Sequence, residues 1–214
     1  MKVVSRMSLE IRPLRKQDFD RVIQFAITGM HFDHYTQNRT ILNLYGRYFW
    51  YLELERASQV LAAYEGDQLA GVLLADMKGE KKAFQSFWRQ QYVRIINFLQ
   101  KIFYKDGVGP YDAANKEMFS EFAGKQHLDG EINFLAADPN AQTRGIGTAL
   151  LQELEKREAG KTIYLYTDNN CTWQFYEHRG FKRVGEKQIA LEFDDMGEVP
   201  LSCYLYSKVC GASA

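Results

Sequence analysis

The feature that most constrains this chain is a glycine turn between a predicted strand and a predicted helix. In the run QTRGIGTALLQELEK, Gly145 and Gly147 bracket a single isoleucine, and apolar residues at helical spacing follow over 148–155. Just upstream, residues 132–136 have the pattern of a strand. Such a turn brings unpaired backbone N–H groups and the positive end of a helix dipole to one point. The sequence therefore predicts an anion site, usually one for phosphate.

Two familiar nucleotide motifs fit this turn poorly. A dinucleotide-binding G-x-G-x-x-G turn needs a third glycine where this chain has Leu150. A Walker loop ends in Gly-Lys-Ser/Thr, whereas Gly147 is followed directly by Thr148 with no lysine. The turn is expected to hold another phosphate ligand, or to need its glycines only for backbone geometry.

The composition is that of one globular domain over 1–214. The 27 basic and 27 acidic residues cancel, so the global charge gives no reason to expect nucleic acid or a membrane surface as partner. The three cysteines have neither metal-ligand nor disulfide spacing, which suits a reducing, cytoplasmic environment. No apolar run is long enough for a signal sequence or a membrane span.

Seven strands and several helices are expected along the chain. The strands are residues 9–12, 60–64, 69–74, 131–136, 162–166, 187–193 and 201–206, with a turn at 65–67 joining the second and third into a hairpin. Helices are expected from the N-cap Asp18 toward residue 30, over about 36–56, after the glycine turn, and over 172–179 up to Gly180.

Residues of about 76–128 form an insertion that this order does not require. Apolar positions at helical spacing mark its centre, namely Phe84, Phe87, Trp88, Ile95, Phe98, Leu99, Ile102 and Phe103. Many lysines and arginines accompany them, against the single acid Glu80. We expect a helical arm with one apolar and one basic face. Because such a stripe needs burial, the arm should cover the acceptor side of a pocket or form the interface of a homodimer.

Two blocks of the sequence resemble the GNAT superfamily of N-acetyltransferases. The pattern Gln142-x-x-Gly145-x-Gly147, after a strand that ends in Ala137-x-Pro139, is similar to the acetyl-CoA motif of that family. The block NNCTWQFYEHRGF, residues 169–181, is similar to its Asn-x-x-Ala-x-x-x-Tyr-Glu-x-x-Gly-Phe segment, with Thr172 in place of alanine. The resemblance implies a single α/β (α+β) domain, in which a mixed, mostly antiparallel sheet is flanked by helices and carries the insertion at about 76–128.

The resemblance also implies acetyl-CoA as co-substrate. Its pyrophosphate would lie against the turn formed by Gln142, Thr143, Arg144, Gly145, Ile146, Gly147 and Thr148. Beyond a bulge, the strand that starts at Glu131 would separate from the one at Ile163, so that pantetheine pairs with the main chain near Leu135 and Ala137. Asn169 matches a CoA-contacting asparagine, and it could also cap the helix that follows.

Two residues are implied as catalytic groups. Tyr176 matches the tyrosine that serves many relatives as general acid, and a phenol of pKa about 10 can protonate a thiolate of pKa about 8.5. The alternative for Tyr176 is packing alone. Glu131 has the sequence context of the general base in histone-acetylating relatives, although a water chain or a plain solvated glutamate are alternatives.

The expected function is acetyl transfer from acetyl-CoA to a primary amine by direct attack in a ternary complex. A non-catalytic acyl-CoA sensor is the alternative, and a nucleic-acid adaptor is a weaker one. The acceptor is open, although the acidic run 192–198 favours a cationic amine. We expect no membrane partner and no metal, since His31 and His34 lack a third ligand.

Overall fold

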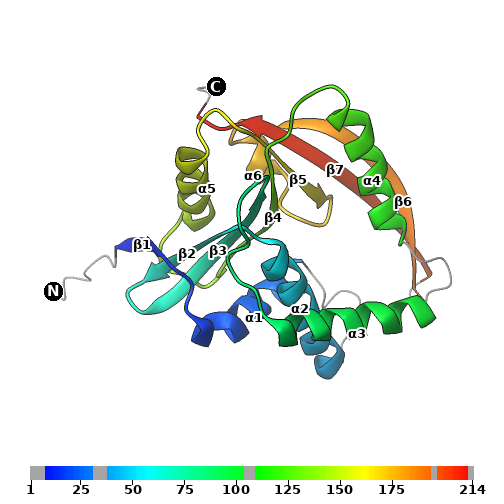
Figure 1. The fold of residues 1–214 in the computed structure, drawn as a ribbon, viewed down its shortest axis with the longest axis horizontal. Helices are drawn as coiled ribbons and strands as arrows, with labels where there is room; N and C mark the ends of the chain where they lie inside the picture. The colour runs from blue at the N-terminus through cyan, green and yellow to red at the C-terminus, as the bar shows by residue number, and fades with distance from the viewer. Residues whose placement is uncertain (1–7, 31–37, 104–108, 194–196, 212–214) are drawn as a thin grey trace.

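The computed structural model describes residues 8–30, 38–103, 109–193 and 197–211. Its centre is a seven-stranded sheet in the order β1-β2-β3-β4-β5-β7-β6 (Figure 1). The strands are β1 Leu9–Arg12, β2 Gln59–Glu65, β3 Gln68–Met77, β4 Gly130–Ala137, β5 Thr162–Asp168, β6 Lys182–Phe193 and β7 Gly197–Val209. All neighbouring pairs are antiparallel except β4 and β5. The mixed, mostly antiparallel sheet predicted from the sequence is confirmed.

Helices cover both faces of the sheet. The α-helices are α1 Phe19–Gly29, α2 Arg39–Arg56, α3 Phe87–Phe103, α4 Pro110–Ala123, α5 Ile146–Arg157 and α6 Gln174–Glu177, and a short 3-10 turn, η1 Lys16–Asp18, precedes α1. The strand β3 shows why two layers form. Its Val72 and Leu74 pack in one core with α1 and α2, while Leu73 and Ala75 pack in another with α5. Because successive side chains of a strand point to opposite faces, one apolar run serves both layers.

The sheet is nearly divided between β4 and β5. These strands pair only at Gly130↔Ile163 and Glu131↔Tyr164. On the other edge of β4, Leu74 pairs with Phe134 but Ala75 pairs with Ile132, so Asn133 is an extra residue in the ladder. The expected bulge and the separation beyond it are both present. Among the described residues they leave the edge of β4 that faces β5 without a strand partner after Glu131, and we call this separation the gap.

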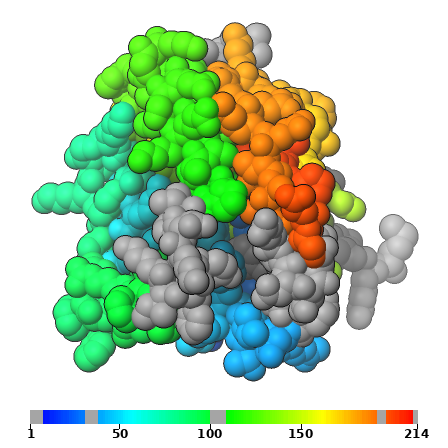
Figure 2. Space-filling model, turned by 90° about the vertical axis from the view of Figure 1, so that its right-hand side faces the viewer, coloured from blue at the N-terminus to red at the C-terminus, as the bar shows by residue number. Residues whose placement is uncertain are grey.

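The insertion contains two helices in two different places (Figure 1). The first, α3, packs along α2, and the second, α4, packs on β6 and β7. Figure 2 shows the green α4 lying against the orange β6. The prediction of a single helical arm was wrong, because the two helices pack on different elements. Its basic face was wrong for Arg89, which faces α2, where Glu55 holds it at 2.7 Å. The large apolar side chains of α3 are exposed.

Other boundaries differ from expectation for local reasons. Asp18 occupies the N-cap position of α1, but its carboxylate accepts from Arg15 and from the Tyr64 hydroxyl instead of capping the helix. The helix expected over 172–179 is shorter, and the chain leaves it in a Schellman motif at the expected Gly180. There the Phe181 N–H donates to the Tyr176 carbonyl and the Gly180 N–H to the Glu177 carbonyl. Across the residues described, no helix is both long and apolar enough to cross a membrane.

Candidate active site

The glycine turn starts α5 at a fixed point. Gly145 is its N-cap residue and has a φ of 79°, a left-handed conformation that favours glycine. The next side chain, Ile146, is buried and anchors the turn in the core. This anchoring requires Gly71 on β3, because a Cβ there would lie 2.5 Å from the Ile146 Cγ2. The orphan N–H groups of the first turn of α5 therefore face outward at a defined place.

A buried carboxylate occupies the beginning of the turn. Glu65 at the end of β2 accepts from the Gln142 N–H at 3.2 Å and from the Thr143 N–H at 2.5 Å. Hydrogen bonds from Thr143 and Gln142 hold the pKa of Glu65 below its usual value, against the opposing effect of burial. The N–H groups of Gln142 and Thr143 are therefore already engaged, and contact of these two residues with a ligand stays a prediction. The donors left for a phosphate are those from Arg144 to Thr148.

The second glycine has a packing role beside the ligand contact predicted for it. A Cβ at Gly147 would meet the ring of Phe175 at 3.2 Å, so this glycine lets α5 approach α6. The guanidinium of Arg179 stacks over the Phe175 ring, with its carbon 3.6 Å from the ring centroid. Arg179 donates from Nε to the Thr148 hydroxyl oxygen at 3.1 Å and from Nη1 to the Phe175 carbonyl at 2.9 Å. A fixed positive charge thus stands beside the N-terminus of α5.

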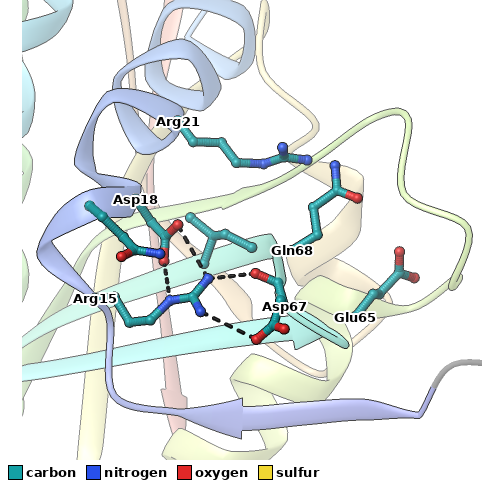
Figure 3. Close-up of a pocket in the computed structure, with 8 residues that line it drawn as sticks. Arg15, Asp18, Arg21, Glu65, Asp67 and Gln68 are labelled. Carbon is teal, nitrogen blue, oxygen red and sulfur yellow. Dashed lines mark hydrogen bonds and ion pairs between the residues drawn. The ribbon is translucent and has the colours of Figure 1, made fainter.

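An open pocket lies next to this turn rather than in it. It is formed by α1, η1 and the turn between β2 and β3 (Figure 3). Its arginines already have acidic partners: Arg15 pairs with Asp18 at 2.8 Å and with Asp67 at 3.4 Å. Arg21 pairs with Asp138, the first residue after β4, at 2.5 Å. We interpret the pair between Arg21 and Asp138 as the contact that links the loop before the glycine turn to α1.

A cluster of polar side chains lies where β4 and β5 part. Arg56 of α2 donates to Glu131 at 2.8 Å and to Glu53 at 3.3 Å. The bulge residue Asn133 donates from Nδ2 to the Glu53 carboxylate at 2.9 Å. Tyr164 of β5 donates its hydroxyl to Glu131 at 3.2 Å. One guanidinium is therefore shared by two carboxylates, one from α2 and one from β4.

Glu53 is the unusual member of this cluster. It is 6% exposed, and burial raises its pKa to about 7, although Arg56 and Asn133 act in the opposite direction. Burial by itself lowers the pKa of Arg56, but Glu53 and Glu131 raise it overall. A carboxyl group with a pKa near neutrality in such a place is a candidate proton acceptor. The sequence analysis did not find Glu53.

Tyr176 is held on the other side of the gap. It is the residue whose carbonyl closes the Schellman motif of α6, and its ring packs 5.7 Å from Phe181 and 6.4 Å from Tyr206. Burial raises the pKa of Tyr176, and the nearby Cys171 adds to this effect. The phenol therefore keeps its proton at neutral pH, which a general acid must do before it acts.

The remaining predicted residues lie along the same edge. Leu135 is partly exposed and Ala137 is exposed on β4 beyond the bulge, while the side chains of Gln142 and Arg144 are exposed on the turn. Asn169 does not cap α6, whose N-cap is Trp173. Its Oδ1 instead accepts from the Ser202 N–H at 2.8 Å, which closes the end of the β5–β7 ladder.

His31 and His34 lie outside the described residues, as do residues 194–196 of the acidic run. Among the residues that are described, no group of three or more His, Cys, Asp or Glu side chains is arranged to hold a metal ion.

Comparisons with known proteins point to one family. The family model "Acetyltransferase (GNAT) domain" matches residues 113–183. A segment of 57 residues is 42% identical to the N-alpha-acetyltransferase RimI of Mycobacterium tuberculosis, a match that covers 26% of this chain and 36% of that relative. The chain therefore spans little more than a third of the curated relative that it matches.

Solved structures show the same fold over nearly the whole chain. The histone acetyltransferase HPA2 and related acetyltransferase from Corynebacterium glutamicum aligns with a TM-score of 0.55 and 16% identity, over 97% of this chain and 99% of that one. The PaiA N-acetyltransferase from Thermoplasma acidophilum, solved in complex with coenzyme A, aligns with a TM-score of 0.51 and 17% identity, over 95% and 99% of the two chains.

Proposed function

We propose that the chain is an acetyltransferase of the GNAT superfamily and that it transfers an acetyl group from acetyl-CoA to a primary amine. The observation that carries the proposal is that β4 separates from β5 beyond Glu131, with the N-terminus of α5 after the end of β4 and two carboxylates that share Arg56 at the point of separation. A mere acyl-CoA sensor would need the first feature but not the second.

The residues present fit acetyl-CoA. The orphan N–H groups from Arg144 to Thr148 and the charge of Arg179 suit a pyrophosphate. A Cβ at Gly145 would meet nothing within 4 Å, so the backbone there is open to a ligand. Beyond Glu131, the edge of β4 that faces β5 has no strand partner among the described residues, which suits the amide groups of pantetheine.

The chain's own groups can manage the protons of the reaction. When bound, acetyl-CoA supplies the acetyl carbonyl that a neutral amine attacks and a thiolate that departs. Glu131 would take the proton from the amine, and Glu53 would receive it through ordered water, while Arg56 stays protonated and holds the two carboxylates together. Tyr176 would donate its hydroxyl proton to the departing sulfur.

Cysteine chemistry favours direct transfer. The sequence has three cysteines, and burial raises the pKa of Cys171 to about 12, of Cys203 to about 11 and of Cys210 to about 12. These thiols stay protonated at neutral pH and are poor nucleophiles. We therefore propose a ternary complex without an acetyl-cysteine intermediate, which mass spectrometry of the protein mixed with acetyl-CoA alone would detect.

The acceptor is proposed to be a cationic amine. Glu53 and Glu131 together carry more negative charge than Arg56 neutralises, so an ammonium group would balance the cluster. The relative named N-alpha-acetyltransferase RimI makes a peptide N-terminus the first acceptor to test. A cytoplasmic location stays a prediction.

Tyr176→Phe tests the catalytic assignment. We expect kcat with an amine acceptor to fall roughly ten- to a thousandfold, while acetyl-CoA affinity by calorimetry stays unchanged, because the hydroxyl acts only as the thiolate leaves. Tyr166→Phe on β5 serves as the control for removing a phenol from the same region. If Tyr176→Phe is fully active, Tyr176 is a packing residue. If no amine in a broad panel is acetylated by the wild-type protein, the sensor alternative is favoured.

A further inference from the structure

A row of large apolar side chains covers the side of α3 that faces away from α2. Phe87 is 65% exposed, Trp88 80%, Ile95 58%, Phe98 64% and Leu99 42%. At 3.6 residues per turn, these five positions fall within about 120° of the helix circumference. We call this row the α3 face.

The opposite side of α3 is fully engaged with α2. The Tyr92 ring packs 5.5 Å from the Tyr51 ring and its hydroxyl donates to the Leu44 carbonyl at 3.2 Å. Farther along, Asn97 accepts from the Tyr48 hydroxyl at 2.5 Å. The orientation of α3 is therefore fixed. The helix runs along the border of the molecule (Figure 1), and the residues of the α3 face are exposed there.

The α3 face is large enough for a specific interface. A large aromatic or aliphatic side chain has about 150–250 Å² of surface, so the five exposed ones offer roughly 600 Å². Two copies would bury about 1,200 Å², which is the lower end for specific protein contacts. A monomer seldom exposes one contiguous apolar patch of this size without a function for it.

The charge of the α3 face indicates which partner fits. Residues 87–103 contain no acidic residue and three basic ones: Arg89 is paired with Glu55, Arg94 lies at the border of the face, and Lys101 follows near the end of α3. Each basic residue near an anionic membrane surface adds only weakly to binding, and α3 offers two besides Arg89. A face with so little charge needs a partner that is itself apolar and uncharged.

The spacing of the exposed positions is symmetric about Val93. Phe87 and Leu99 lie six residues before and after Val93, and Trp88 and Phe98 lie five residues before and after it. The polar Gln91 and the apolar Ile95 lie two residues before and after it. When two antiparallel copies of this helix are related by a two-fold axis at the level of Val93, each residue lies opposite the residue of the other copy that is equally far from Val93 on the other side. We propose that the α3 face is the interface of a homodimer, in which α3 packs antiparallel against α3 of a second copy of this chain.

Sedimentation velocity over a range of concentrations tests whether the dimer forms. We expect the wild-type mass to rise from 24.8 kDa toward twice that value. Trp88→Glu should shift the equilibrium to monomer by at least tenfold, because it buries a charge in the contact opposite Phe98 of the second copy. Lys81→Glu introduces the same side chain six residues before α3 begins and should leave the dimer intact.

Cross-linking tests the antiparallel register. Trp88→Cys combined with Phe98→Cys should give a covalent dimer with a short bifunctional thiol reagent, whereas each single variant should not. The reason is that Trp88 faces Phe98 of the other copy and lies about 15 Å from the second Trp88. The inference is overturned if the wild type stays monomeric at all concentrations, if Trp88→Glu leaves the dimer unchanged, or if Trp88→Cys alone cross-links fully. It is equally overturned if the monomer binds anionic phospholipid vesicles through Trp88. None of these outcomes depends on acetyl transfer.

Discussion

Glu53 shows how a residue acquires its chemistry from its surroundings. On α2 it stands in the same stripe as the buried Trp50 and Leu54, so the helix carries it into the core. There it meets the side chain of Asn133, which the bulge in β4 directs toward α2. The carboxyl is desolvated but not fully neutralised, which leaves its pKa close to the pH at which an enzyme works.

The first prediction concerns the pH dependence that Glu53 imparts. Its pKa is raised in the folded state, so the folded protein binds more protons than the unfolded chain between about pH 4.5 and pH 7. Stability should therefore be greatest below that window and fall as the pH rises through it, by at most on the order of 3 kcal/mol. Glu53→Gln should remove this fall, as urea unfolding at several pH values would show.

The same variant has a kinetic consequence. If Glu53 receives the proton, Glu53→Gln should lower kcat and abolish the rise of kcat near pH 7, with acetyl-CoA affinity unchanged. Glu55→Gln, which loses the contact with Arg89 on the outer side of α2, is the matched control and should keep that rise. A pH profile identical to the wild type would assign Glu53 to structure alone.

The second prediction concerns Arg179. Arg179→Ala should weaken acetyl-CoA binding about tenfold or more, since it removes a charge next to the phosphate-binding turn. Acetyl-pantetheine, which lacks the nucleotide and its phosphates, should bind equally well to both proteins. Calorimetry with both ligands separates lost phosphate contact from general damage: an equal loss for both would indicate that Arg179 only supports α6.

At the scale of elements, turns and helix ends could be predicted from the sequence, whereas contacts between elements could not. The glycine turn, the hairpin turn and the stop at Gly180 depend on neighbours in sequence, and each was predicted. Glu65 could not be assigned to the turn, because Gln142 and Glu65 meet only when β2 and α5 are in place. Glu53 had one readable signal, since it interrupts the apolar stripe of α2 next to Leu54.

The third prediction tests how α5 is seated on the sheet. Gly71→Ala should destabilise the protein by about 1–3 kcal/mol, because the new methyl group overlaps Ile146. Acetyl-CoA affinity should fall with it, since Ile146 anchors the turn. Gly109→Ala, where a Cβ would meet nothing within 4 Å, is the control and should change neither property. Unfolding in denaturant and calorimetry would measure both effects.

At the scale of the whole molecule, two pairs of residues join the halves of the sheet and a shared core supports them. Ile163, Leu165 and Tyr206 from the second half pack in the same core as α5 and β3 from the first. The fourth prediction follows: coenzyme A at about a hundred times its Kd should stabilise the protein by about 2.7 kcal/mol. In hydrogen exchange, protection should increase chiefly over 130–137 and 142–148. Uniform protection, or none in these segments, would contradict binding in the gap.

The separation of β4 from β5 also bears on how the sheet is protected from aggregation. Beyond Glu131, the edge of β4 that faces β5 has no strand partner among the described residues. An unpaired strand edge is a template on which a strand of another molecule can add. Paired strands lie about 4.8 Å apart, so a strand inserted between β4 and β5 needs about twice that width, and the pairs Gly130↔Ile163 and Glu131↔Tyr164 deny it that width at the root of the gap. The closed end of the gap therefore limits how far a foreign strand can extend along β4.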